Sequence, residues 1–231
     1  SRVSTPRFTW WRGKRMSQRR RRRRGRLGEW SRTLGIDDAP SRRGERGNVL
    51  VVGAVYRGGH TFEGLLSTTV RRDGANATAK LIRMIRPSKF YRQLDAILLD
   101  GIALGGFNVV DLDRLYAAVA LPVVVVMRQP PDLPGMIHAL AKVPGPARKE
   151  AILKRAGPIH TIEVNYTAAA DGGSAGEATQ GELFCQLRGL TPLDASALLN
   201  GTCTRSKIPE PIRAAHLIAA GVTRGESGRR A

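Results

Sequence analysis

A short apolar run, Ala96–Leu99, leads directly into Asp100 and Gly101. A segment that is apolar at every position is typical of a strand buried on both faces of a sheet. Open α/β sheets bind their ligands at the carboxyl ends of such strands. Asp100 is therefore the first candidate site residue, although an Asp–Gly pair can also simply open a turn.

A β-hairpin is predicted earlier in the chain. Asn48–Arg57 is rich in β-branched residues, which favours a strand. Gly58–Gly59 supplies a tight turn, and Thr61–Val70 has the pattern of the returning strand. The shorter segment Leu34–Pro40 (LGIDDAP) is apolar at its start and ends in two acids and a proline. It predicts a first strand that precedes the hairpin.

After the hairpin, the apolar spacing predicts helices with strands between them. Apolar residues at helical spacing predict a helix over Ala77–Ile85 and another over Val109–Val119. The other predicted elements are strands over Leu121–Met127 and Ile159–Tyr166 and helices over Met136–Lys142, Ala147–Ala156, Gln180–Arg188, Pro192–Leu199 and Pro211–Gly221.

The order of these elements predicts the fold class. Three leading antiparallel strands followed by alternating helices and strands describe an α/β protein with a ribonuclease H-like mixed sheet flanked by helices. A doubly wound Rossmann order is the competitor. It is disfavoured because the first connection is a hairpin and no G-x-G-x-x-G follows the first strand. A chain of 231 residues is short for two domains, so we expect residues 31–231 to form a single domain.

Two acids are expected to meet in this fold. The first strand lies beside the strand that ends at Asp100, which brings Asp37 and Asp100 together. Two carboxylates a few Å apart repel each other unless one is protonated or a divalent cation lies between them. Proteins hold magnesium with one or two carboxylates together with phosphate and water oxygens. The pair therefore predicts a metal site of the kind that hydrolyses phosphodiesters.

Other polar residues are weaker candidates. Asp73 ends the third predicted strand and could join the same metal site, but it precedes a glycine and equally indicates a turn. Asp38 should face away from Asp37, because side chains alternate along a strand. His216 lies within an apolar helical segment, so we expect a packed or surface histidine rather than a metal ligand.

The composition indicates in which cellular compartment the protein is expected. The hydrophobic fraction is 42%, and no apolar run is long enough to span a membrane. No apolar region of a signal peptide follows the basic start. Cys185 and Cys203 lack metal-ligand spacing, so we expect buried thiols in a reducing compartment and a cytoplasmic protein, with a disulfide as the alternative.

The net charge of +19 is concentrated near the start of the sequence. Residues 1–30 hold twelve Lys and Arg, including the run Arg19–Arg24, against the single acid Glu29. Like charges in such a run repel one another and predict a disordered arm over residues 1–30. An arm of this kind binds DNA or RNA through phosphates, although a solvated tail is the alternative.

Several motifs together resemble an archaeal family of uncharacterised conserved proteins related to endonuclease V. The resemblance covers the chain from about Thr33 to Ala231. The motifs that carry it are Leu34–Pro40 (LGIDDAP), Gly64–Ser67 (GLLS), Leu99–Gly101 (LDG), Val123–Arg128 (VVVVMR) and Ile208–Leu217 (IPEPIRAAHL). The resemblance implies a ribonuclease H-like fold and a relation to enzymes that cut DNA or RNA near deaminated bases such as inosine, using magnesium or manganese.

Individual positions agree with endonuclease V only in part. By this resemblance, Asp37 matches the first-strand catalytic aspartate and Asp100 the aspartate of the D-G loop. A catalytic glutamate of the third strand falls on Val70, and a histidine before the penultimate helix falls near Gly189.

Three functional hypotheses follow. The leading one is a nucleic-acid-binding protein with a two-aspartate Mg²⁺ or Mn²⁺ site, acting as a metal-dependent phosphodiesterase or endonuclease. The second is a catalytically silent nucleic-acid-binding module that lacks the full endonuclease V set. The third is an enzyme that acts on a small phosphorylated ligand at the same edge of the sheet.

Overall fold

The computed structural model describes residues 27–28, 31–40, 47–168 and 177–227. The strands in this part of the chain are β1 (Arg32–Asp38), β2 (Asn48–Arg57), β3 (Thr61–Arg71), β4 (Ala96–Asp100), β5 (Ala103–Leu104), β6 (Asn108–Val109), β7 (Val123–Met127), β8 (His160–Thr167) and β9 (Ala178–Arg188). The helices are α2 (Ala77–Ile85), α3 (Leu112–Val119), α4 (Leu133–Leu140), α5 (Pro146–Arg155), α6 (Pro192–Asn200) and α7 (Glu210–Arg224).

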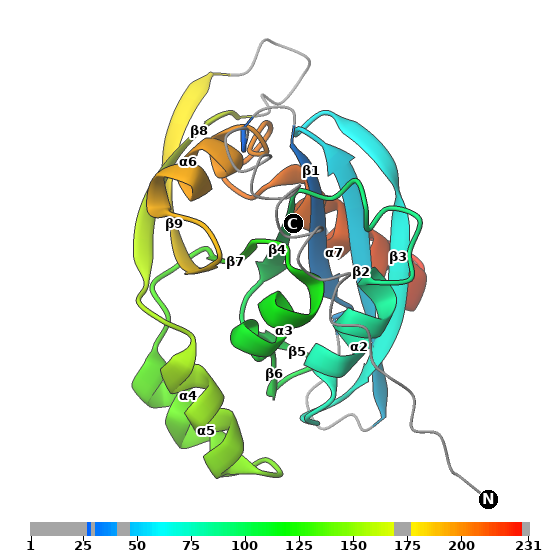
Figure 1. Ribbon diagram of the computed structural model, residues 1–231, viewed down its shortest axis with the longest axis vertical. Helices are drawn as coiled ribbons and strands as arrows, with labels where there is room; N and C mark the ends of the chain where they lie inside the picture. The colour runs from blue at the N-terminus through cyan, green and yellow to red at the C-terminus, as the bar shows by residue number, and fades with distance from the viewer. Residues whose placement is uncertain (1–26, 29–30, 41–46, 169–176, 228–231) are drawn as a thin grey trace, which may run out of the picture.

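A seven-stranded mixed sheet is the centre of the described structure (Figure 1). Its strand order is β3-β2-β1-β4-β7-β9-β8. Strands β1, β4 and β7 run parallel to one another. On one side, β2 pairs antiparallel with β1, and β3 pairs antiparallel with β2. On the other side, β9 pairs antiparallel with β7, and β8 pairs antiparallel with β9. The expected first strand, hairpin and central β1–β4 pair are therefore confirmed.

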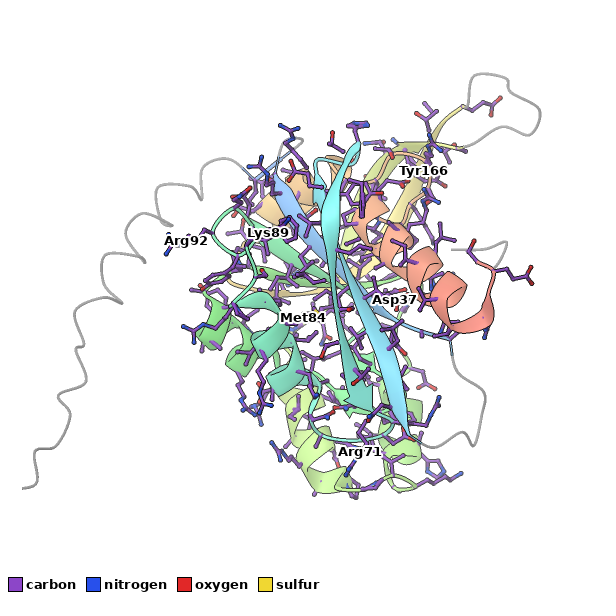
Figure 2. All side chains as sticks on the ribbon, turned by 90° about the vertical axis from the view of Figure 1, so that its right-hand side faces the viewer. Asp37, Arg71, Met84, Lys89, Arg92 and Tyr166 are labelled. Atoms are coloured by element: carbon purple, nitrogen blue, oxygen red, sulfur yellow. The ribbon has the colours of Figure 1, made fainter. Side chains whose placement is uncertain are left out.

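Alternation along β4 separates two cores. Ile97 and Leu99 belong to the core that includes residues of α2 and α3, whereas Ala96 and Leu98 pack with residues of α6 and with Ile212 of α7. Because side chains alternate along a strand, a fully apolar strand is needed where both faces are covered. In Figure 2, α2 and α7 lie on opposite sides of the strands. Asp100 continues the Ala96–Leu98 series and faces the α7 side.

Gly35 allows α7 to approach β1 very closely. A Cβ atom at this position would overlap the carbonyl carbon of Pro211 and the main-chain nitrogen of Ile212, both at the start of α7. Gly35 and Asp37 lie on the same face of β1, because they are two residues apart. The close contact at Gly35 therefore brings the following turns of α7 over Asp37.

The prediction of a helix over Gln180–Arg188 is wrong, because this segment is most of strand β9. β9 lies between β7 and β8 and pairs with both. Leu183 and Cys185 alternate with more exposed neighbours and are fully buried, which is the period of a strand. Hydrogen bonding to β7 on one edge and to β8 on the other holds this segment in the extended conformation of a strand.

The other predicted elements agree with the structure to within a few residues at their ends. One difference has a clear cause: α3 begins at Leu112, three residues later than predicted, because the Asp111 side chain accepts a hydrogen bond from the main-chain N–H of Arg114. The segment between β4 and α3 contains the small hairpin β5–β6. The predicted arm over residues 1–30 lies almost entirely outside the described residues.

None of the helices in the described part of the chain has the length and apolar character that a membrane span requires. Cys185 and Cys203 are both buried free thiols, as expected, and burial raises the pKa of Cys185 to about 12. The alternative of a disulfide between them is wrong.

Candidate metal centre

Asp37 and Asp100 lie at the carboxyl ends of neighbouring parallel strands. The register pairs Ile36 of β1 with Leu99 of β4, so the next residue on each strand is an aspartate. Both side chains face the layer that contains α7. The sequence-based expectation that these two acids meet is therefore realised in the structure.

A third potential ligand comes from α7. Nδ1 of His216 lies 2.7 Å from Oδ2 of Asp37. A nitrogen of His216 and one carboxylate oxygen each from Asp37 and Asp100 all lie within 4.8 Å of one another. Asp37 is only 6% exposed, so this cluster is formed inside the junction between the sheet and α7.

The pKa values of two members of the cluster, Asp100 and His216, are raised by their surroundings. Burial, followed by the negative charge of Asp37, raises the pKa of Asp100 to about 6, although Arg128 and His216 oppose this shift. The guanidinium Nη2 of Arg128 lies 3.5 Å from Oδ2 of Asp100. Because a carboxylate only accepts, Nδ1–H of His216 is the donor to Asp37, and this hydrogen bond raises the pKa of His216.

Asp38 lies close to the pair without belonging to it. Its main-chain N–H donates to Oδ1 of Asp37 at 2.8 Å, and its own carboxylate accepts from the main-chain N–H of Gly105. Burial, followed by the charge of Asp37, raises the pKa of Asp38 to about 6. Its carboxylate thus bonds to the β5–β6 hairpin and not to the ligand cluster, in line with the expected alternation along the strand.

The donor set fits a divalent cation. Carboxylate oxygens suit Mg²⁺ and Mn²⁺, and an imidazole beside them is a common additional ligand for a transition metal. The two carboxylates repel each other, as the raised pKa of Asp100 reflects, and a divalent cation between them would supply compensating positive charge. Asp37 and Asp100 would hold such an ion, with His216 as ligand or as partner of Asp37.

The structure does not bring Asp73 into this cluster. Asp73 follows β3 with a left-handed backbone (φ 49°), and its Oδ1 accepts a hydrogen bond of 2.8 Å from the main-chain N–H of Phe107. Its side chain thus closes a turn against the β5–β6 hairpin. Val70, the position of the endonuclease V glutamate in the resemblance, is completely buried in the core.

His216 is the site residue that was not expected from the sequence. Helical apolar spacing around it predicts only burial, and the structure shows that the same spacing turns it toward Asp37. One signal was present, because His216 belongs to the Pro209–His216 segment (PEPIRAAH) that carries part of the resemblance.

A leading antiparallel hairpin, a central parallel pair β1–β4 and one acid at the end of each strand define a ribonuclease H-like protein. Similarity to solved structures agrees with this fold. The endonuclease V of Bacillus subtilis superimposes with a TM-score of 0.52 at 12% identity, covering 95% of each chain. At this identity the similarity concerns the fold alone.

The chain belongs to the Endonuclease dU family, whose model matches residues 29–223. A UPF0215 protein of Methanothermobacter thermautotrophicus is 44% identical over 198 residues, which cover 85% of this chain and 89% of that protein. A UPF0215 protein of Deinococcus radiodurans is also 44% identical, over 85% of this chain and 91% of its own. The family is thus related to endonuclease V by fold and includes members in archaea, as the sequence motifs indicated.

A protein of unknown function from Archaeoglobus fulgidus matches with a higher TM-score and a higher identity. The crystal structure of that protein has a TM-score of 0.70 at 38% identity, covering 84% of this chain and 99% of that chain. The described fold therefore applies to nearly the whole length of that relative.

Proposed function

We propose that this protein is a metal-dependent endonuclease that hydrolyses phosphodiester bonds in nucleic acid at the Asp37–Asp100–His216 cluster. The observation that carries the proposal is the convergence of these three side chains at the carboxyl ends of β1 and β4. The family name also supports it, because dU is the standard abbreviation of deoxyuridine, which makes deoxyuridine-containing DNA the first substrate to test.

Each residue has a distinct part in the proposed reaction. Asp37 and Asp100 would hold Mg²⁺ or Mn²⁺, which supplies charge stabilisation at the phosphate and lowers the pKa of a bound water. His216 donates to Asp37 and so keeps that carboxylate oriented. Arg128, beside Asp100 and partly exposed, offers a guanidinium to a phosphate that enters the centre.

A catalytically silent nucleic-acid-binding module is the second candidate. Val70 is an apolar core residue where the resemblance places a glutamate of endonuclease V. Gly189 has a left-handed backbone (φ 82°), and any side chain there would overlap Tyr116. Neither position can supply the missing acid or base. The third hypothesis, a small phosphorylated substrate, remains a prediction for the same centre.

Nucleic acid as the partner is part of the proposal. The net charge of +19 favours binding to phosphates, and the basic residues 1–30 provide a further contact. Removing residues 1–30 is expected to reduce the slope of log K against log salt. An unchanged slope would exclude the arm as a phosphate contact. A cytoplasmic location is also proposed, since two buried free thiols suit a reducing compartment.

Cleavage assays separate the two candidates. Oligonucleotides that contain deoxyuridine, inosine or a branch, as DNA and as RNA, are incubated with the protein in Mg²⁺ or Mn²⁺. The endonuclease proposal expects metal-dependent cleavage that Asp37→Asn and Asp100→Asn abolish. Cleavage that survives both substitutions would refute the centre. Binding without cleavage of any substrate would favour the silent module.

A further inference from the structure

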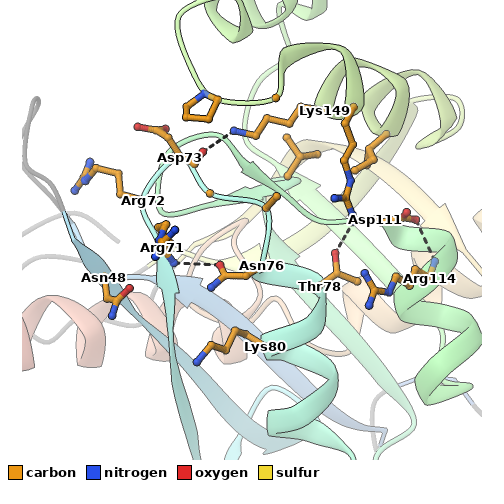
Figure 3. Close-up of a pocket in the computed structure, with 17 residues that line it drawn as sticks. Asn48, Arg71, Arg72, Asp73, Asn76, Thr78, Lys80, Asp111, Arg114 and Lys149 are labelled. Carbon is orange, nitrogen blue, oxygen red and sulfur yellow. Dashed lines mark hydrogen bonds between the residues drawn. The ribbon is translucent and has the colours of Figure 1, made fainter.

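A cavity lies at the same edge of the sheet as the candidate metal centre, beyond the carboxyl end of β3 and on the side of the sheet that α2 covers. It has a volume of about 620 Å³ and is enclosed by the end of β3, the starts of α2 and α3, and the start of α5 (Figure 3). This volume is in the range of pockets that bind ligands of nucleotide size. None of the residues of the metal cluster lines it.

The lining of this cavity is strongly basic. Its two acids, Asp73 and Asp111, both have partners: Asp73 accepts from Phe107, and Asp111 accepts from Arg114 and binds Arg155 at 3.0 Å. Six basic side chains line the same space: Arg71, Arg72, Lys80, Arg114, Arg148 and Lys149.

Four of these six cations lack an acidic partner. In the part of the chain that the structure describes, no carboxylate lies within ion-pair distance of Arg71, Lys80, Arg114 or Arg148. The cavity therefore has a surplus of positive charge that its own acids do not balance, which favours an anionic ligand.

Lys149 gives independent support, because it is only 2% exposed. Its Nζ donates one hydrogen bond of 2.6 Å to the main-chain oxygen of Asp73, as Figure 3 shows. An ammonium group has three donors, and no other acceptor among the described residues bonds to this one. Burying a cation is costly unless it is paired and fully hydrogen-bonded. Burial lowers the pKa of Lys149, and the nearby Asp73 charge only opposes this shift, so a phosphate oxygen in the cavity would add both negative charge and a second acceptor.

The start of α5 adds donors on the same side. Gly145, which lines the cavity, precedes α5 in a left-handed conformation (φ 70°) and provides no side-chain cap. The first main-chain N–H groups of a helix have no partner within it, and the helix dipole makes this end positive. Phosphate groups bind readily at such ends when basic side chains are present.

We propose that this cavity binds a phosphate-bearing nucleotide unit of the nucleic-acid strand that the metal centre cleaves, which rests on the proposed function. A single residue connects the two places. Gly105 donates its N–H to the Asp38 carboxylate, and its carbonyl oxygen accepts from the N–H of Asp73 at 2.9 Å. Asp38 is the neighbour of Asp37, and the cavity and the metal centre both lie at the carboxyl ends of parallel strands, so a strand bound at the centre that crosses this hairpin would reach the basic cavity.

Binding without catalysis tests this assignment. Arg114→Ala, Arg148→Ala and their double variant are compared with the full-length protein, using a fluorescent oligonucleotide in EDTA over a salt series. Each lost phosphate contact is expected to lower the slope of log K against log salt by about 1. Arg92→Ala is the matched control, because this exposed arginine lies in the loop before β4, at the opposite edge of the sheet (Figure 2). It removes the same charge and should leave the slope unchanged.

Free nucleotides are the other source of the same chemistry. Titration with deoxyuridine monophosphate and with inorganic phosphate, followed by calorimetry, distinguishes them from a strand. Loss of mononucleotide binding in the double variant, with unchanged oligonucleotide binding, would refute the strand assignment in favour of a free nucleotide. If neither ligand responds to the substitutions, the cavity is not a phosphate site.

The buried lysine allows a second test. Lys149→Met keeps the length of the side chain and removes its charge, and it should weaken oligonucleotide binding in the same way. If this variant does not fold, the exposed arginine variants still decide the question. Because these measurements are made without divalent metal, a failure of the endonuclease proposal would appear as absent cleavage with binding intact.

Discussion

His216 and Asp37 are 179 residues apart in the chain, yet Nδ1 of one lies 2.7 Å from Oδ2 of the other. The first residue is on α7 and the second at the end of β1. Their contact depends on the docking of α7 against the sheet, since Gly35 leaves no side chain between the two elements. The candidate metal centre is therefore a product of tertiary packing as much as of strand order.

Replacing His216 should weaken the centre without unfolding the protein. His216→Ala removes the donor that orients Asp37, and loss of such a partner typically lowers metal affinity or activity roughly 10–100-fold. Mn²⁺ titration and cleavage rates measure the effect. His138→Ala, which changes an exposed histidine of α4, is the control. Equal activities of the two variants would contradict a role for His216.

Asp100→Asn should stabilise the metal-free protein at neutral pH while it abolishes cleavage. The folded-state pKa values of Asp100 and Asp38 are raised to about 6, so the folded state binds more protons than the unfolded state between about pH 4 and 6. The free energy of unfolding therefore falls as pH rises through this window. His216 acts in the same direction, because its pKa is also raised and its contribution is lost as pH rises.

Denaturant unfolding in EDTA measures this effect. At pH 7.5, Asp100→Asn should raise the free energy of unfolding by about 1–3 kcal/mol, and the difference should vanish near pH 4. Saturating Mn²⁺ should reverse the order, because it stabilises the wild type more than the variant. A variant that is less stable than the wild type at pH 7.5 in EDTA would contradict the electrostatic account.

Asp73→Asn separates the two roles that the sequence left open for Asp73. Asparagine tolerates the left-handed backbone and retains an oxygen that can accept from Phe107, so stability should change by less than about 0.5 kcal/mol. Cleavage and Mn²⁺ affinity should both be retained. A loss of activity as large as that of Asp100→Asn would instead indicate that Asp73 is a ligand of the metal.

Gly35→Ala should disrupt the metal centre indirectly, by displacing α7, although Gly35 is not itself part of the centre. The new methyl group would press against the main chain of Pro211 and Ile212, and overpacking of this kind typically costs about 1–3 kcal/mol. Because α7 must move outward, His216 should also leave Asp37, and cleavage should fall further than stability explains.

Gly53→Ala provides the matched comparison for Gly35→Ala. Its nearest neighbours are the ends of the Leu34 and Met84 side chains, which can move. Thermal unfolding and cleavage rates are measured for both variants at a temperature where both are folded. Equal loss of activity in the two would show that the contact between β1 and α7 has no special effect on the centre.

The sequence predicts most of the fold because the spacing of apolar residues within each segment is enough to identify that segment as a helix or a strand. The alternation in β2 and β3, the apolar run before Asp100 and the spacing in α2 each identify an element without reference to the others. The meeting of Asp37 with Asp100 follows from strand order alone. β9 was predicted as a helix because Gln180–Arg188 contains few β-branched residues, and its pairing with β7 and β8 is not visible in the local sequence.

The rest of the candidate centre depends on contacts between distant segments. His216 has an ordinary helical environment in the sequence, and only the docking of α7 places it at Asp37. Asp73 follows a strand at the expected edge of the sheet, but its carboxylate accepts a hydrogen bond from the main-chain N–H of Phe107 and does not reach the metal centre. Strand order can place an acid at an edge, whereas it does not determine which neighbour the side chain will bind.

The close contact between β1 and α7 also affects when the centre can form during synthesis. Ribosomes add residues in order, so every strand of the sheet, up to Arg188, has been made before Glu210 begins α7. A nascent chain with a nearly complete sheet still lacks His216. The complete three-residue cluster thus forms only after α7 has left the ribosome, so the candidate centre is finished last although two of its three members are made first.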